Sequence, residues 1–129
     1  MATKVWISGN DAGIQQMNAS FKKLNTTMVD LMQVHNLVDV HTHIKTLKAW
    51  KDQGKIKYYG ITHYQSGAYS EMIKIIKKEK PDFVQFNYNI GDRQAEKQLL
   101  PICMDYGAAV MINRPFEEGG LFMKVKNKP

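Results

Sequence analysis

The chain has 129 residues, of which 43% are hydrophobic and 23% charged, and its formal net charge is +6. This composition is typical of one ordinary globular domain with a sizeable core. It argues against a membrane-spanning protein, because no apolar run approaches the roughly 20 residues that a span needs. The first residues lack the apolar segment of a secretory signal, which predicts a cytoplasmic location, and the single cysteine, Cys103, leaves no internal disulfide to form.

The predicted elements alternate along the chain between two kinds of segment. Short apolar stretches rich in β-branched and aromatic residues predict strands, and longer stretches with apolar residues three and four apart predict helices. The predicted strands are 4–8, 28–35, 56–62, 82–88 and 108–113, and the predicted helices are 11–25, 41–53, 67–78 and 92–106. Gly54 and Gly107 follow two of these helices, where a left-handed cap residue is expected. Pro101 predicts a kink or a break inside the last helix.

This order predicts an α/β fold of five parallel strands joined by right-handed helical crossovers. Two architectures fit it, a small open doubly wound sheet and a part of an eight-stranded barrel. In both, functional side chains gather at the carboxyl ends of the strands. Those ends carry a markedly polar set: Ser8, His35, Thr62, His63, Gln85, Asn87, Asn113 and Arg114.

The positive charge is spread along the chain. The densest lysine groups fall at 74–80 and 124–129, and the first of them alternates with apolar residues as the solvated side of an amphipathic helix does. A nucleic-acid surface is therefore not expected. We expect one domain over residues 1–123, followed by a basic tail over residues 124–129.

Taken in order, the segments resemble the aldo/keto reductase family. ATKVWISG is similar to the third strand of the family's barrel, and SFKKLNTTMVDLMQVHN to the following helix and fourth strand. LKAWKDQGKIKYYGITHY is similar to the segment that ends in Gly-Val-Ser-Asn. DFVQFNYNIGDRQAEKQLLPICMDYG and AAVMINRPFEEGGL resemble the sixth and seventh strands with the segments that follow them. The resemblance implies a partial TIM barrel, an NADP(H) cofactor and the reduction of a small carbonyl substrate.

The family's catalytic tetrad consists of Asp, Tyr, Lys and His. The resemblance places its lysine on Lys4 and its histidine on His35. Hydride addition to a carbonyl creates negative charge on the oxygen, which a histidine N–H and a lysine ammonium stabilise while a proton donor completes the reaction.

The resemblance also assigns residues to the cofactor. The contacts to the nicotinamide carboxamide fall on Thr62, His63 and Gln85, and His63 stands where the family usually has asparagine. Asn113 stands where the family has an aromatic ring that stacks on the nicotinamide. Arg114 and the loop after it would face the diphosphate.

The resemblance begins at the family's third strand and ends after its seventh. The segments that would carry the Asp and Tyr of the tetrad, and the eighth strand that holds much of the adenosine phosphate, have no counterpart in these residues. Loss of a positioned general acid lowers a rate by roughly 10²–10⁴-fold, so we expect weak or no reductase activity from this chain alone. A sheet cut from a barrel also has two open edges. This predicts a homo-oligomer that covers the strand edges near residues 4–8 or 108–113.

Two alternatives remain at this point. The stretch His41-Thr42-His43 resembles the opening motif of metal-dependent amidohydrolases, since residues two apart in a strand point the same way and can share one ion. It follows the predicted strand 28–35 with no room for a helical crossover. We therefore expect His41 and His43 to lie in a loop and the first turn of a helix, and we expect no metal site. The other alternative is a non-catalytic oligomerisation or interaction module, which NADPH binding would distinguish from a reductase.

Overall fold

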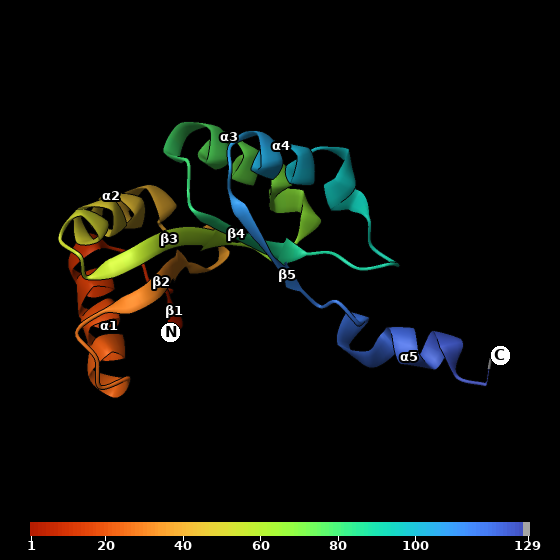
Figure 1. Ribbon diagram of the computed structural model, residues 1–129, viewed down its shortest axis with the longest axis horizontal. Coiled ribbons are helices and arrows are strands. Elements are labelled where there is room, and N and C mark those ends of the chain that lie inside the picture. Colours follow the sequence, from red (N-terminus) through yellow and green to blue (C-terminus); the bar gives the residue numbers. More distant parts are fainter. Residues whose placement is uncertain (128–129) are drawn as a thin grey trace.

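The computed structural model describes residues 1–127 and contains one parallel sheet. Its strands are β1 (Ala2–Val5), β2 (Val29–Val34), β3 (Ile56–Thr62), β4 (Phe83–Asn87) and β5 (Ala109–Asn113). They lie side by side in the order of the sequence (Figure 1). A doubly wound sheet reverses its strand order part-way. The sequential order therefore selects the second predicted architecture, and the α/β fold of a partial TIM barrel is confirmed.

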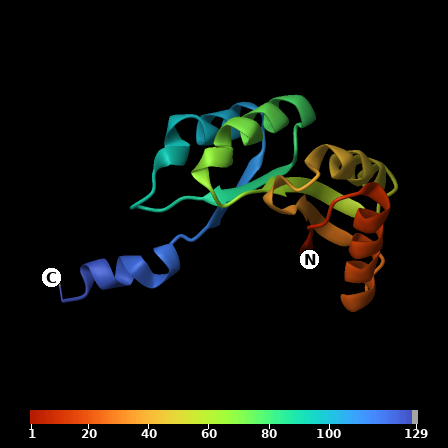
Figure 2. The same cartoon turned by 180° about the vertical axis from the view of Figure 1, so that it is seen from behind.

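The helices between the strands lie on one side of the sheet. They are α1 (Asn10–Lys23), α2 (Val40–Asp52), α3 (Tyr69–Glu79) and α4 (Leu99–Asp105). Right-handed crossovers between strands in sequence order bring every connecting helix to the same face, and Figures 1 and 2 show the opposite face without helices. Among residues 1–127 no helix is long and apolar enough to cross a membrane.

The core lies between the sheet and these helices. Residues directly opposite each other on neighbouring strands form a row across the sheet. In this row Val5 is opposite Val34, Val34 is opposite Ile61, and Ile61 is opposite Val84. All four side chains are fully buried. The helices complete the core with buried side chains that include Met17, Leu47, Met72, Leu99 and Cys103.

The other face of the sheet corresponds to the inside of a barrel. In the register Lys4 is the partner of Gln33, and Thr62 is the partner of Gln85. Gln33 and Thr62 are each 2% exposed, whereas Tyr58 on the same face is 44% exposed. The polar side chains of the predicted site thus lie on the face that no helix covers.

β1 differs from its prediction, since it spans Ala2–Val5 and not residues 4–8. The side chain of Gln16 forms hydrogen bonds with the backbone of Trp6, which a further strand residue would otherwise use to pair with β2. Its Oε1 accepts the Trp6 N–H at 2.6 Å, and its Nε2 lies 3.4 Å from the Trp6 carbonyl oxygen. Gly9, with φ of 92°, then turns the chain into α1. Ser8 therefore lies in a loop and not at a strand end.

The predicted helix over residues 92–106 is broken, as Pro101 indicated. A short 3-10 helix covers Gln94–Lys97, and α4 begins at Leu99. The break falls at Gln98, whose φ and ψ are −145° and −46°. Pro101 then sits in the first turn of α4, where its missing N–H leaves no hydrogen bond unmade.

Two helices end at glycines, as predicted. Gly54 follows α2 with φ of 72°, and Gly107 follows α4 with φ of 70°. This left-handed conformation costs glycine little because it has no Cβ. α3 ends differently, at Lys80 with φ of 51°, immediately before Pro81.

One further helix was not predicted. α5 (Gly120–Val125) follows a single 3-10 turn and projects away from the sheet and the other helices (Figures 1 and 2). It spans the expected boundary between the domain over 1–123 and the basic tail over 124–129. The last two residues of that tail lie outside the described residues.

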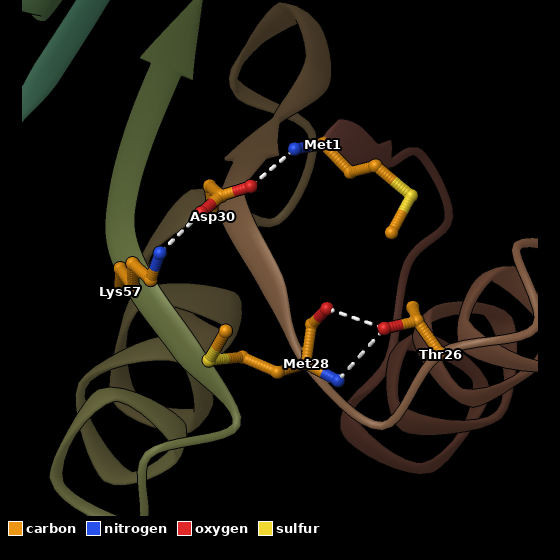
Figure 3. A network of polar contacts seen from close by, with 5 residues as sticks. All are labelled: Met1, Thr26, Met28, Asp30 and Lys57. Carbon is orange, nitrogen blue, oxygen red and sulfur yellow. Dashed lines mark hydrogen bonds and ion pairs between the residues drawn. The ribbon is translucent and has the colours of Figure 1, made fainter.

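A polar network joins the first three strands at their amino ends (Figure 3). The Asp30 carboxylate in β2 pairs with the α-amino group of Met1 and lies 2.7 Å from Nζ of Lys57 in β3. Before β2, the Thr26 hydroxyl donates to the Met28 carbonyl oxygen at 2.8 Å and accepts the Met28 N–H at 3.3 Å. In a barrel this end is remote from the carboxyl ends of the strands, so these contacts hold strands together and do not face the candidate site.

Candidate active site

His35 lies at the centre of the predicted side chains. It follows β2 directly and begins the 3-10 turn His35–Leu37. Its Nδ1 is 3.3 Å from Oγ1 of Thr62, the last residue of β3. Lys4 and His35 line one open pocket of about 430 Å³, together with Thr3, Trp6 and Gln16. The structure therefore brings the predicted lysine and histidine together beside Thr62.

The hydrogen bonds around His35 favour one tautomer. The backbone N–H of Asn36 points to Oγ1 of Thr62 over 3.5 Å. A hydroxyl that accepts this N–H can donate its own hydrogen to Nδ1 of His35, which leaves the ring hydrogen on Nε2. Burial lowers the pKa of His35, and the charges of Lys4 and His63 lower it further. The imidazole is therefore mainly neutral at pH 7 and offers one N–H donor.

Trp6 contacts His35 and was not predicted as a site residue. The two ring centres are 5.3 Å apart and the rings are nearly perpendicular, at 82°. An edge-to-face contact of this kind restrains the plane of the imidazole. The signal in the sequence is the position of Trp6, two residues after Lys4, because residues two apart in the predicted strand 4–8 share a face.

His63 follows Thr62 and is fixed from both sides. Its backbone N–H donates to the Gln85 carbonyl oxygen at 3.0 Å, and its Nδ1 accepts the N–H of Gln65 at 3.1 Å. Its ring stacks on Tyr64 with centres 5.6 Å apart. Burial lowers the pKa of His63. The neutral ring thus carries its hydrogen on Nε2 and is a donor there.

Gln85 and Asn113 contact each other across β4 and β5. Gln85 Nε2 donates to Asn113 Oδ1 at 2.6 Å. Gln85 Oε1 and Asn87 Oδ1 are buried and have no hydrogen-bond partner among residues 1–127. This part of the site therefore presents acceptors that no side chain of the described chain satisfies.

Arg114 lies at the margin of the site. Its Nε is 2.9 Å from the Glu118 carboxylate, and its guanidinium carbon is 5.3 Å from the centre of the Tyr64 ring. Its charge is thus already paired. A contact with a diphosphate would have to compete with Glu118.

Gln33 is a second residue that sequence reasoning missed. Its side chain is buried, and its Nε2 has no partner within residues 1–127. A Cβ added to Gly60 would lie 3.2 Å from Gln33 Cγ and 2.6 Å from the Phe83 carbonyl oxygen, so the glycine makes room for Gln33. Gln33 lies in β2, two residues before His35, which follows the strand. In the predicted strand 28–35 this spacing places both residues on one face.

His41 and His43 both lie in the first turn of α2, which agrees with the expected helical turn and leaves neither residue in the expected loop. His41 is exposed, while His43 is fully buried with its Nε2 2.6 Å from the Ile7 carbonyl oxygen. Residues two apart in a helix point to different sides, so these two rings do not face one ion. Within residues 1–127 no three His, Cys, Asp or Glu side chains are grouped to hold a metal.

Comparison with models of protein families gives a match over almost the whole sequence. The model described as the aldo/keto reductase family covers residues 2–129. The chain belongs to the aldo/keto reductase family.

Two curated aldo/keto reductase relatives come from Escherichia coli. An NADH-specific methylglyoxal reductase is 26% identical over 111 residues, which cover 81% of this chain and 33% of that protein. Methylglyoxal reductase YeaE is 26% identical over 117 residues, which cover 89% of this chain and 41% of that protein. The chain thus spans between a third and about two fifths of the length of these relatives.

Solved aldo/keto reductase structures share the fold. The holo form of an aldo-keto reductase from Bacillus halodurans is 27% identical, with a TM-score of 0.78 over 92% of this chain and 41% of that one. An aldo/keto reductase from Klebsiella pneumoniae, solved in complex with NADP and acetate, is 20% identical, with a TM-score of 0.76 over 96% of this chain and 44% of that one. The five strands are therefore arranged as in a segment of an aldo/keto reductase barrel.

Proposed function

We propose that the chain forms the part of an NADP(H)-dependent carbonyl reductase site that contains the catalytic histidine and lysine and the nicotinamide contacts. The contact between His35 and Thr62 carries this proposal. It fixes a neutral imidazole, in the pocket that Lys4 also lines, at the carboxyl ends of parallel strands. Active sites of barrel enzymes are built at this end.

The residues present fit the nicotinamide end of the cofactor. NADP(H) supplies the hydride when it is bound. A carboxamide has N–H donors and one carbonyl acceptor, and the site offers the hydroxyl of Thr62, the Nε2–H of His63 and the free Oε1 of Gln85. Ring stacking is not supplied by Asn113. One relative is named as NADH-specific, so both reduced nucleotides belong in a binding test.

The roles of His35 and Lys4 follow from their charges. The neutral His35 donates an N–H to the substrate oxygen, and the Lys4 ammonium stabilises the negative charge that develops there. Residues 1–129 include no counterpart of the Asp and Tyr of the family's tetrad. Proton delivery therefore lacks its usual donor, and turnover by the chain alone is slower by roughly 10²–10⁴-fold. A small aldehyde such as methylglyoxal, the substrate in the names of two relatives, is the proposed substrate class.

Nucleotide titration of the purified chain tests this function. NADPH or NADH fluorescence should change on binding, and Gln85→Ala should weaken binding while His41→Ala, an exposed histidine outside the site, should not. Residual reduction of methylglyoxal should disappear in His35→Ala. Absence of binding by both nucleotides would exclude the proposal and favour the non-catalytic interaction module. Turnover that persists in His35→Ala would exclude the role of His35.

We also infer that the chain pairs with further copies of itself. In the described part of the chain, β1 and β5 each have a strand on one side only. The face of the sheet opposite the helices is covered by no element within these residues. Unpaired strand edges and exposed apolar surface favour association with another chain.

A further inference from the structure

The side-chain amide of Gln85 has two ends in different surroundings. Its Nε2 donates to Asn113 Oδ1 at 2.6 Å. Its Oε1 is buried with no hydrogen-bond partner in the described residues 1–127. One end of the amide is therefore held by the protein, and the other is left for a ligand.

The backbone holds this contact in place. Gln85 is paired with Met111 and Asn87 with Asn113 in the parallel register of β4 and β5. Gln85 and Asn87 lie two residues apart on one face of β4, and Asn113 lies on the same face directly across from Asn87. Gln85 and Asn113 are therefore diagonal neighbours on that face. On the other side of β4, Gln85 is paired with Thr62 of β3. The amide is thus enclosed by regular structure on both sides.

An amide can rotate by 180° and exchange its donor and acceptor ends. An acceptor opposite one end selects one of the two orientations. We propose that Asn113 is a positioning residue that holds Gln85 with Oε1 directed into the site, which makes the site selective for a ligand group that donates N–H. The inference rests on the proposed function, because the group in question is the primary carboxamide of the nicotinamide.

The surroundings support a primary carboxamide in particular. Asn87 Oδ1 is a second buried acceptor with no partner in residues 1–127, and a primary carboxamide has two N–H groups to donate. Asn113 stands where the resemblance places an aromatic ring. At this position an aromatic ring would stack on the nicotinamide, whereas Asn113 orients Gln85, and Gln85 then accepts a hydrogen bond from the carboxamide.

Two nucleotides that differ only in this group test the inference. NADPH and its 3-acetylpyridine analogue are compared by calorimetric titration, because the acetyl group keeps the carbonyl oxygen but has no N–H. The unsubstituted chain should bind NADPH about 5- to 100-fold more tightly than the analogue, which is the range expected when a buried acceptor is left unpaired. Asn113→Ala should bring the ratio close to one. Asn113→Asp, which keeps an acceptor, should preserve most of the preference.

Ile112→Ala is the matched control, since Ile112 is next to Asn113 in β5 and faces the other side of the sheet. It should leave the preference unchanged. A preference that survives in Asn113→Ala overturns the inference. Asn113→Asp that behaves like Asn113→Ala also overturns it, because Asn113 would then be the donor and Gln85 Oε1 would not be free.

A measurement without nucleotide separates this inference from the proposed function. In ¹⁵N-resolved spectra the Gln85 side-chain amide, assigned by its loss in Gln85→Ala, should show one hydrogen-bonded proton that exchanges slowly with water. That signal should persist in Asn113→Asp and shift in Asn113→Ala. If neither nucleotide binds, the proposed function fails, and the amide signal still decides whether Asn113 fixes Gln85. An unchanged signal in Asn113→Ala overturns the inference whether or not nucleotide binds.

Discussion

At the scale of single residues, Gly13 and His43 show how a helix is shaped by its neighbour. A Cβ added to Gly13 in α1 would lie 2.3 Å from Cε1 and 2.7 Å from Nδ1 of His43 in α2. The imidazole is fully buried and donates to the Ile7 carbonyl oxygen at 2.6 Å, so it has little freedom to move aside. The histidine that the amidohydrolase motif suggested as a metal ligand is thus a core residue that joins two helices to the loop after β1.

Gly13→Ala should therefore destabilise the protein. In an open helix position the change from glycine to alanine stabilises by about 1 kcal/mol. Here the overpacking should outweigh that gain and lower the free energy of unfolding by about 1–3 kcal/mol. Urea unfolding measures it. In a His43→Ala background, which removes the obstructing ring, the same change should become neutral or stabilising. Equal or greater stability of Gly13→Ala in the original chain would show that the contact is not tight.

At the scale of the elements, the amino ends of β1, β2 and β3 are joined through Asp30. Hydrogen bonds from Lys57 and from the α-amino group of Met1 lower the pKa of Asp30 from 3.8 to about 2 (Figure 3). A carboxyl group with a lowered pKa in the folded state stabilises the fold when the pH is above its ordinary pKa. That stabilisation is lost as the pH falls through the folded value.

Asp30→Asn should therefore change the pH dependence of stability. The original chain should be more stable than the variant above pH 3.8, and the difference should disappear as the pH falls toward 2. Denaturant unfolding at a series of pH values measures this. Added salt should reduce the difference, because the groups are exposed. Asp105→Asn is the control, since Asp105 is exposed and makes no ion pair within residues 1–127. A difference that does not vary with pH would contradict this role of Asp30.

At the scale of the whole molecule, helices cover one face of the sheet and leave the other face uncovered within residues 1–127 (Figures 1 and 2). The helices bury the row from Val5 to Val84, whereas the register places Lys4, Tyr58 and the amide side chains on the opposite face. The free edge of β5 adds apolar surface on the helix side, where Ile112 is half exposed. A second copy that paired with this edge would remove Ile112 and the unpaired backbone groups of β5 from water.

Association should be visible by light scattering as a mass above 14.8 kDa that rises with concentration. Ile112→Lys places a charge on the β5 edge and should shift the equilibrium toward monomer. Ala49→Lys places the same charge on the exposed side of α2, which packs on β2 and β3 and not on an edge strand, and should have a smaller effect. A single monomeric species at every concentration would contradict the inference that copies associate.

The sequence by itself determined the local features of this protein. The β/α alternation, the glycines after α2 and α4, the break before Pro101 and the helical position of His41 and His43 all follow from periodicity and backbone preference over a few residues. The resemblance placed Lys4, His35, Thr62 and Gln85 near one another, because it covers consecutive strand ends.

Only the tertiary structure decided the features that depend on contacts between distant segments. The sequential strand order excludes a doubly wound sheet, and no local pattern encodes strand order. β1 ends at Val5 because the side chain of Gln16, ten residues after Trp6, forms hydrogen bonds with the backbone N–H and carbonyl of Trp6. Gln85 Oε1 has no partner within residues 1–127, and Asn113, 28 residues away, binds the other end of the same amide. Periodicity reports which face a residue occupies, but a hydrogen bond across strands needs both strands in place.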